Sequence, residues 1–231
     1  MLEGLKGHTV VVGLGRTGFA IVETLRSLGE RVVVIESNRS RAQECAEAFP
    51  GIEVVTGDAK EEEILELASI RSAERLLVNT SSDSENMFIV VTARELNPDL
   101  FISCRVTRPE NEEKLRRAGA DLTYLPESIS GRSVAIAVLK PELASFFREI
   151  LLSETAPYML EIVPVDGRSP VRGRAISSFF NEEVFGLLLA LVRGKELLIN
   201  PPRRTVVEAG DRLIVLGSLE QVENLRSTVS S

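Results

Sequence analysis

The stretch Val10–Leu25, VVVGLGRTGFAIVETL, decides how the N-terminal half of the chain folds. An apolar run leads into Gly13, Gly15 and Gly18 at GxGxxG spacing, and apolar residues then recur at helical intervals. The first glycine permits a tight turn, the second lets backbone approach a pyrophosphate, and the third allows a helix to pack closely on a strand. Unpaired amides at the helix start attract phosphate. The stretch therefore predicts a strand, a nucleotide-binding turn and a helix.

Short apolar runs and helix-period segments continue to alternate as far as Leu125. The predicted strands cover 8–13, 31–36, 52–57, 75–80, 101–105 and 122–126, and the predicted helices cover 17–28, 39–48, 60–67, 84–96 and 110–118. Several strands are apolar at consecutive positions, which is typical of a sheet buried on both faces. This alternation predicts an α/β fold with a Rossmann-like, doubly wound parallel sheet and right-handed crossovers.

The pattern changes after Pro126. Residues 127–152 have helical spacing with a break before Pro141, because proline lacks the amide and clashes with the preceding turn. Strand segments are predicted at 158–165, 185–193, 195–202 and 204–217, with turns marked by RGK at 193–195, NPP at 200–202 and AGD at 209–211, and a closing helix at 218–229. We expect an N-terminal nucleotide-binding lobe at 1–130, a helical bridge at 131–153, and a smaller α+β lobe at 154–231.

The second predicted strand ends in an acid, Glu36, eighteen residues after Gly18. A carboxylate at this place accepts hydrogen bonds from the ribose hydroxyls of a dinucleotide. It also repels a 2′-phosphate, an effect that Arg39 tempers. The other candidate binding residues in these two loops are Leu14, Arg16, Thr17 and Ser37.

Further candidates follow the other strands, because an open α/β sheet binds ligands outside the carboxyl ends of its strands. Asp58 and Ala59 follow the third strand, Thr80 and Ser81 end the fourth, and Arg105 ends the fifth. The planar guanidinium of Arg105 suits phosphate. The alternative for Arg105 is a surface ion pair.

Composition and charge exclude several classes of protein. The chain has 231 residues, 44% of them hydrophobic, and a net charge of −7, which opposes a sequence-independent grip on nucleic acid. Its longest apolar runs, such as 185–192, are far shorter than the about 20 residues that span a bilayer. Cys45 and Cys104 show neither disulfide nor metal spacing. We expect reduced thiols in a cytosolic protein.

The sequence offers little for catalysis. The one histidine, His8, precedes the first strand and is expected at the end of the sheet opposite the cleft. The C-terminal portion offers no nucleophile–base pair and no metal cluster. We therefore expect no catalytic residue and favour a binding module over an enzyme. An NAD-dependent oxidoreductase and a free-standing nucleotide or redox sensor remain as alternatives.

Several motifs in order resemble a known family. GHTVVVGLGRTG, GDA, SSDSEN, SCRVTRPEN, LRRAGAD and YLPESISGR resemble the nucleotide-binding lobe of RCK (regulator of K⁺ conductance) or KTN domains. The segment GKELLINPPRRTVVEAGDRLIVLGSLEQVENL is similar to the C-terminal lobe of the same Trk- and Ktr-type regulators. Together the motifs cover about Leu5–Val229.

The resemblance implies a cytoplasmic module that pairs into homodimers and an octameric ring, beside the membrane subunit of a potassium channel or transporter. It implies an adenine nucleotide, NAD(H) or ATP/ADP, whose binding changes the angle between lobes. Gly13, Gly15 and Gly18 would face phosphate. Glu36 would hold the ribose and Asp58 would lie near the adenine. Arg16 and Arg105 would reach phosphate, with Thr80 and Ser81 lining the cleft.

One departure from the family concerns calcium. Calcium-gated members carry an acid after the fourth strand and two glutamates around the end of the fifth. Asp83 resembles the first, although its other interpretation is a helix cap, and Arg105 and Thr107 stand at the latter positions. Calcium takes several oxygen ligands and a guanidinium opposes it. We expect no calcium at this site.

Overall fold

The computed structural model describes residues 4–152 and 157–230, and it divides into two compact units that meet in sequence at Arg132 and Ser133. The predicted boundaries at 153 and 154, and the two chain ends, lie outside the described residues. The helical segment starts at Pro126, one residue before the predicted helical spacing and inside the first unit.

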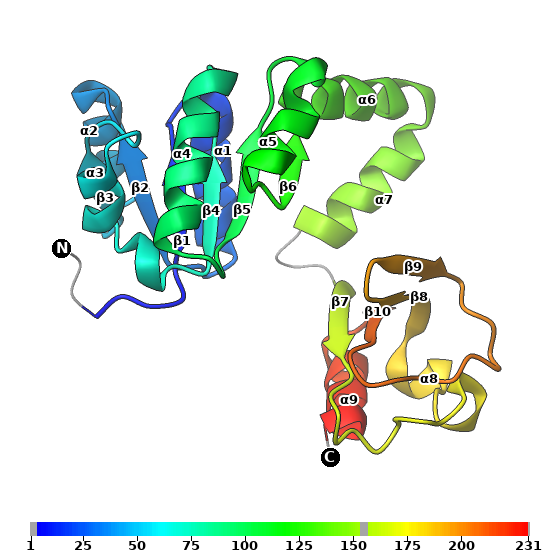
Figure 1. The fold of residues 1–231 in the computed structure, drawn as a ribbon. Coiled ribbons are helices and arrows are strands. Elements are labelled where there is room, and N and C mark those ends of the chain that lie inside the picture. The colour runs from blue at the N-terminus through cyan, green and yellow to red at the C-terminus, as the bar shows by residue number, and fades with distance from the viewer. Residues whose placement is uncertain (1–3, 153–156, 231) are drawn as a thin grey trace. The chain divides into compact units, whose positions relative to one another are not determined.

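The N-terminal unit is built on one parallel sheet of six strands (Figure 1). The strands are β1 Thr9–Val12, β2 Val32–Glu36, β3 Glu53–Thr56, β4 Arg75–Val78, β5 Phe101–Arg105 and β6 Leu122–Tyr124. Their order is β3-β2-β1-β4-β5-β6, so the direction of winding reverses between β1 and β4. Ligands of open α/β sheets bind at the carboxyl ends of the strands at such a reversal. The predicted Rossmann-like fold is confirmed.

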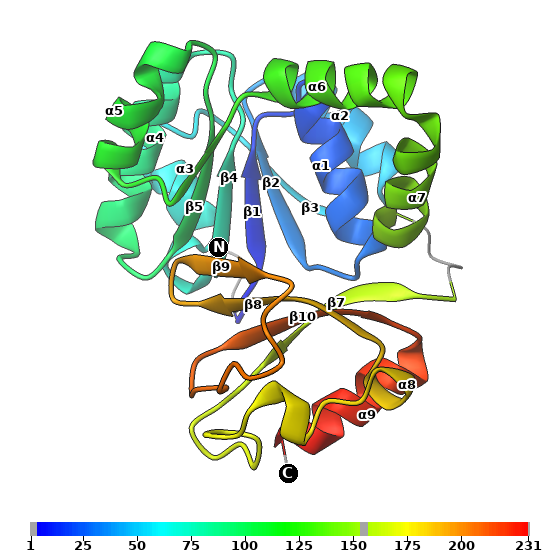
Figure 2. The same ribbon diagram turned by 90° about the vertical axis from the view of Figure 1, so that its right-hand side faces the viewer.

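Helices cover both faces of this sheet (Figure 2). They are α1 Arg16–Ser27, α2 Arg39–Ala48, α3 Glu62–Leu67, α4 Asp83–Leu96 and α5 Glu112–Ala118, with the short 3₁₀ turns η1 Ile70–Ser72 and η2 Pro109–Asn111. Val11 packs with Val22 of α1 and Cys45 of α2, whereas its neighbours Val10 and Val12 pack on the other face. Neighbouring strand residues point to opposite faces, which explains why β1 is apolar throughout.

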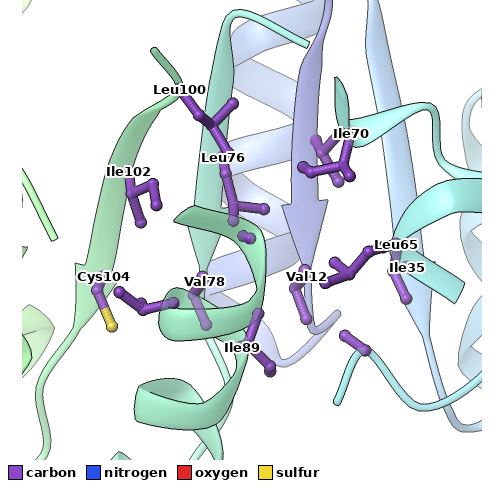
Figure 3. Close-up of a cluster of buried hydrophobic side chains, with 14 of the residues drawn as sticks. Val12, Ile35, Leu65, Ile70, Leu76, Val78, Ile89, Leu100, Ile102 and Cys104 are labelled. Atoms are coloured by element: carbon purple, nitrogen blue, oxygen red, sulfur yellow. The ribbon is translucent and has the colours of Figure 1, made fainter. Parts of the chain in front are cut away.

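The larger of the two cores lies beneath α3, α4 and α5. It contains Val12, Leu65, Leu76, Ile89 and other side chains that Figure 3 shows between the strands and these helices. Leu65 and Leu76 are fully buried, and Ile89 is 2% exposed. This packing fixes the strand ends from which the site residues project.

The helical segment comprises α6 Pro126–Leu139 and α7 Pro141–Leu152, separated at Lys140 as the proline predicts. The C-terminal unit adds β7 Met159–Pro164, η3 Ile176–Ser178, α8 Glu182–Phe185, β8 Leu187–Arg193, β9 Glu196–Ile199, β10 Arg212–Gly217 and α9 Leu219–Ser230. Its antiparallel sheet has the order β7-β10-β8-β9. Leu191, Leu213 and Leu225 form its buried centre. The smaller α+β lobe is confirmed.

The last strand begins directly after the predicted AGD turn at 209–211. Only Arg212–Gly217 of the segment 204–217 forms a strand, and Val206 makes an isolated bridge with Ala175. The cause is a turn: the buried Asp211 accepts hydrogen bonds from the Glu208 amide (2.8 Å) and from Arg193. No helix within the described residues is long and apolar enough to cross a membrane.

Candidate nucleotide-binding site

A cleft of about 250 Å³ opens at the carboxyl edge of the N-terminal sheet, where the direction of winding reverses between β1 and β4. It brings together most of the predicted site residues. Those that line it are Gly13, Leu14, Gly15, Glu36, Ser37, Asp58, Ala59, Thr80, Ser81 and Arg105. Residues from the ends of five different strands thus meet in one place, as the parallel topology dictates.

The glycine turn is tightly packed at two of its three glycines. Gly13 has a φ of +89°, and a Cβ there would lie 3.0 Å from the carbonyl oxygen of Asn79. A Cβ on Gly18 would lie 2.0 Å from the carbonyl oxygen of Gly13, so α1 could not approach β1 with any larger residue. Gly18 is buried and does not line the cleft. Its place fits helix–strand packing rather than phosphate contact.

Gly15 has a different environment. It is the N-cap of α1, with no side-chain cap and no acid in the first turn of the helix. A Cβ added at Gly15 would meet nothing within 4 Å. The start of α1 therefore has free space at Gly15, and its partial positive charge is not offset by a side-chain cap or an acid, which is an arrangement that suits anions.

Arg16 and Thr17 follow Gly15 but do not line the cleft. They face a second cavity of about 770 Å³ in the N-terminal unit, together with Tyr124 and Glu127. Of the predicted phosphate-binding arginines, only Arg105 reaches the cleft within this chain.

Glu36 is 4% exposed and braces the glycine turn. Its Oε2 accepts a hydrogen bond from the Leu14 amide at 2.6 Å, and its Oε1 accepts one from the Asn38 amide at 2.8 Å. Oε1 also accepts the Ser37 hydroxyl at 3.5 Å, whereas Oε2 keeps a second acceptor position. Glu36 can therefore hold the loop and still accept a ribose hydroxyl.

Acidic and basic groups meet at the rim. Asp58 Oδ1 accepts the Lys60 amide at 3.0 Å, and the Lys60 ammonium lies 3.2 Å from Asp58 Oδ2 and 3.8 Å from Glu85. The hydrogen bond and the charge of Asp58 raise the pKa of Lys60. These side chains are about half exposed, so their pairs are weak enough to rearrange around a ligand.

A buried amide joins the ends of β4 and β5. Asn86 Oδ1 accepts hydrogen bonds from the amide (3.2 Å) and hydroxyl (2.7 Å) of Thr80, and its Nδ2 donates to the Arg105 carbonyl at 3.0 Å. Nearby, the Tyr124 hydroxyl donates to Asn79 Oδ1 at 3.1 Å. Burial raises the pKa of Tyr124, so this phenol stays protonated. The floor of the cleft is thereby held rigid.

The structure adds lining residues that the sequence analysis missed: Val12, Ile35, Arg41, Gly57, Asn79, Glu85 and Ile89. Arg41, and not Arg39, reaches the cleft, because residues two apart on a helix point to different sides. A usable signal existed for Asn79, since it directly follows β4. Nothing in the sequence distinguishes Arg41 from Arg39.

Asp83 is not the cap of α4, because Ser82 takes that place. Its buried carboxylate instead accepts hydrogen bonds from the amides of Thr107 (2.7 Å) and Arg108 (3.2 Å) and from Asn111 Nδ2 (2.8 Å). Burial opposes the charge, but these donors outweigh it and lower the pKa of Asp83. The absence of a calcium site here stays a prediction.

His8 is buried immediately before β1, at the amino edge of the sheet, with Nε2 2.9 Å from the Ala68 carbonyl. Burial lowers its pKa. Among the residues that the structure describes, no group of three or more His, Cys, Asp and Glu side chains is placed to hold a metal ion.

Comparison with known families decides the relationship. Residues 9–126 match the model of the TrkA-N domain, about half of the chain, and residues 160–230 match that of the TrkA-C domain. The chain belongs to the TrkA-N domain family. The resemblance to RCK and KTN regulators is thus confirmed.

Two curated relatives of this TrkA-N chain align over nearly its full length. Potassium channel protein 1 of Methanocaldococcus jannaschii is 29% identical over 232 residues, covering 99% of this chain and 68% of that protein. The Trk system potassium uptake protein TrkA homolog of Pyrococcus abyssi is 27% identical over 225 residues, covering 95% of this chain and 96% of that one.

Two solved structures are similar to this chain in fold and sequence. The GsuK RCK domain is 25% identical, with a TM-score of 0.50, over 97% of this chain and 46% of that one. A structure of GsuK bound to ADP is 26% identical, with a TM-score of 0.53, over 59% of this chain and 35% of that one. The TrkA-N chain therefore spans less than half of the GsuK chains and about two thirds of the M. jannaschii channel protein.

Proposed function

We propose that this chain is a cytoplasmic regulator of a potassium channel or transporter, and that it senses an adenine nucleotide in the cleft of its N-terminal unit. Nucleotide binding shifts the arrangement of its lobes and thereby the flux of potassium. The names of the aligned relatives, a potassium channel protein and a potassium uptake protein, support the potassium role.

The observation that carries the proposal is the uncapped start of α1. Its N-cap Gly15 carries no side chain and has open space around it, and Gly15, Glu36 and Arg105 line the same cleft. A ligand that carries both phosphate and ribose matches these groups: phosphate on the amides, ribose hydroxyls on Glu36, and base toward Asp58.

The chemistry of the cleft selects a class of ligands. NAD(H), ATP and ADP share the adenosine phosphate that the cleft fits, whereas the carboxylate of Glu36 opposes a 2′-phosphate. The related structure of GsuK with ADP supports an adenine nucleotide. We propose that the bound nucleotide regulates this chain and takes no part in a catalysed reaction.

The regulatory mechanism requires a two-state assembly. A ligand shifts an equilibrium only if it binds one state more tightly than the other. Taking a population from 1:99 to 99:1 needs about 5.5 kcal/mol of differential binding, which is shared among identical sites in a homodimer or an octameric ring. The helical segment around Gly131–Ile150, bent before Pro141, is the proposed coupling element.

Calorimetric titration of the full chain with NAD, NADH, ATP, ADP and calcium tests the site. We expect at least one nucleotide to bind, and calcium to give no heat. Gly15→Asp should weaken that binding about a hundredfold or more, because it sets a negative charge against phosphate and like charges in contact cost several kcal/mol.

Gly167→Asp is the matched control. It introduces the same charge in the C-terminal unit, where a Cβ also meets nothing within 4 Å. We expect it to bind nucleotide as the wild type does. Equal binding by Gly15→Asp and the wild type would refute the site assignment. A wild type that binds none of the nucleotides would refute the sensing role.

A further inference from the structure

Arg105 lies between two cavities of the N-terminal unit. It is the last residue of β5, and its side chain is 19% exposed. It lines the nucleotide cleft together with Gly15 and Glu36, and it also lines the second cavity together with Tyr124 and Glu127. One guanidinium therefore faces both the proposed ligand and the start of α6.

This guanidinium uses only part of its donor set. Nη2 donates to Glu127 Oε1 at 2.7 Å, whereas Nε is buried and has no hydrogen-bond partner among the described residues. Nε and Nη2 form the side of an arginine that grips an oxyanion through two parallel hydrogen bonds. A buried donor without a partner costs free energy, so an oxyanion that satisfies both donors is favoured over the present pairing.

Glu127 is the weaker partner in this arrangement. It is the second residue of α6, and its side chain is 70% exposed. An ion pair with so exposed a carboxylate contributes little to stability. Breaking the Arg105–Glu127 ion pair costs less free energy than Arg105 gains by donating two charge-assisted hydrogen bonds to a phosphate.

The backbone of Arg105 is held independently of its side chain. Asn86 Nδ2 donates to the Arg105 carbonyl, and β5 pairs with β4 and β6 on its two sides. The guanidinium can therefore change partner while the strand end stays in place. Side-chain variants at Arg105 are expected to fold for the same reason.

The position of Glu127 gives this exchange a consequence. Helix α6 begins in the N-terminal unit and continues through Arg132 into the second unit. The Arg105–Glu127 pair ties its first turn to the end of β5. When the pair opens, the first turn of α6 loses this tether.

We infer that Arg105 is a coupling residue that exchanges Glu127 for a phosphate of the bound nucleotide, so that occupancy of the cleft releases the first turn of α6. The inference rests on the proposed nucleotide site. Because coupling is reciprocal, Glu127 competes with the nucleotide as the nucleotide competes with Glu127.

Titration of the full chain with ADP tests this competition. Arg105→Gln removes the phosphate grip and should weaken binding about ten- to a hundredfold, the range of charge-assisted hydrogen bonds. Glu127→Gln removes the competitor and should tighten binding about two- to fivefold, the range of exposed ion pairs. The matched control Glu113→Gln, an exposed acid of α5 that pairs with Arg117, should bind ADP as the wild type does.

The double variant distinguishes exchange from a general effect of charge. In the Arg105→Gln background, Glu127→Gln should no longer change the affinity for ADP, because the residue for which Glu127 competes is gone. A gain that persists in this background, or Glu127→Gln that binds no more tightly than the wild type, overturns the inference while the nucleotide site stands. A wild type that binds none of NAD, NADH, ATP and ADP overturns both.

Amide hydrogen exchange of residues 128–131 gives a readout that a purely structural ion pair would not change. In the wild type, saturating ADP should speed exchange in this first turn of α6. In Glu127→Gln the exchange should already be fast without ADP, and ADP should add little. Exchange that is the same with and without ADP in the wild type would contradict release of the helix.

Discussion

Helices α1 and α4 begin at the same edge of the N-terminal sheet, and they begin differently. The N-cap of α1 is Gly15, which offers no side chain, and the first turn contains no acid. The N-cap of α4 is Ser82, whose hydroxyl accepts the Glu85 amide at 3.3 Å, and Asp83 and Glu85 supply negative charge in the first turn. One helix start is completed by the chain's own oxygens, whereas the other is the one that we propose receives a phosphate.

The buried carboxylates of Asp83 and Glu36, one near each of these helix starts, also have different roles. Asp83 accepts three hydrogen bonds from the segment that follows β5 and thereby fastens it to α4. Glu36 accepts one hydrogen bond from the glycine turn, at the Leu14 amide, and one from the Asn38 amide after β2, and it also lines the cleft. The comparison predicts that damage near α4 changes stability alone, whereas damage near α1 changes stability, binding or both.

The largest expected effect is at Gly18. Gly18→Ala places a methyl 2.0 Å from the Gly13 carbonyl oxygen, so α1 or β1 must shift. We expect a loss of about 3 kcal/mol or more in the free energy of unfolding, at or above the top of the range for overpacked cores. Urea denaturation followed by circular dichroism measures it.

Gly15→Ala is the control for this variant, since its methyl meets open space. Its free energy of unfolding should match that of the wild type within a few tenths of a kcal/mol. Replacing glycine by alanine changes stability little where the backbone conformation suits alanine without strain. Equal destabilisation by the two variants would show that the turn is not packed as described.

The next effect compares the two bracing acids. Asp83→Ala and Glu36→Ala each leave buried amides without an acceptor, which costs about 1–3 kcal/mol of stability. Chemical denaturation should show a loss in both, and a larger one for Asp83→Ala, which strands three donors. Titration with ADP should show weakened binding for Glu36→Ala alone. If Asp83→Ala weakened ADP binding to the same extent, the proposed difference between a structural Asp83 and a ligand-binding Glu36 would be wrong.

A smaller effect is expected at Ser82. Ser82→Ala removes the cap of α4 and should cost about 1 kcal/mol, the usual value for an N-cap serine. Thermal unfolding with and without ADP measures it. The stabilisation that ADP adds should equal that of the wild type, and a reduced increment would place part of the ligand at α4.

The smallest effect is a pH dependence. The pKa of Asp83 is lowered in the folded chain from its ordinary value of 3.8, so its charge stabilises the fold above that pH and the contribution is lost as the pH falls through the folded pKa. The difference in unfolding free energy between wild type and Asp83→Asn should be constant near neutrality and shrink below about pH 4. A difference that grows in acid would contradict this.

Much of this architecture follows from the sequence because it depends on local patterns. The parallel sheet follows from alternating apolar runs and helix-period segments, and the place of the cleft follows from where Gly13, Glu36 and Arg105 end their strands. Gly13, Glu36 and Arg105 each lie where an apolar run gives way to a glycine or a polar residue, so the sequence itself indicates these strand ends.

What the sequence could not show depends on contacts between distant segments. The hydrogen bond from Leu14 to Glu36 and the ion pair between Arg105 and Glu127 each join residues 22 positions apart in sequence. The placement of Gly18 against Gly13, and of Arg16 away from the cleft, depends on how α1 settles on β1. The AGD pattern marks the turn at Asp211, but the contact of Asp211 with Arg193 of another strand is seen only in the structure.

The most direct test of the central claim follows the backbone amides of the glycine turn in ¹⁵N-labelled full chain as ADP is added. The largest chemical-shift changes should fall on the amides of residues 14–18 and on the Nε–H of Arg105, with residues 82–86 little affected. Changes centred on the start of α4, or none in the glycine turn at saturation, would contradict the claim that the uncapped helix receives the phosphate.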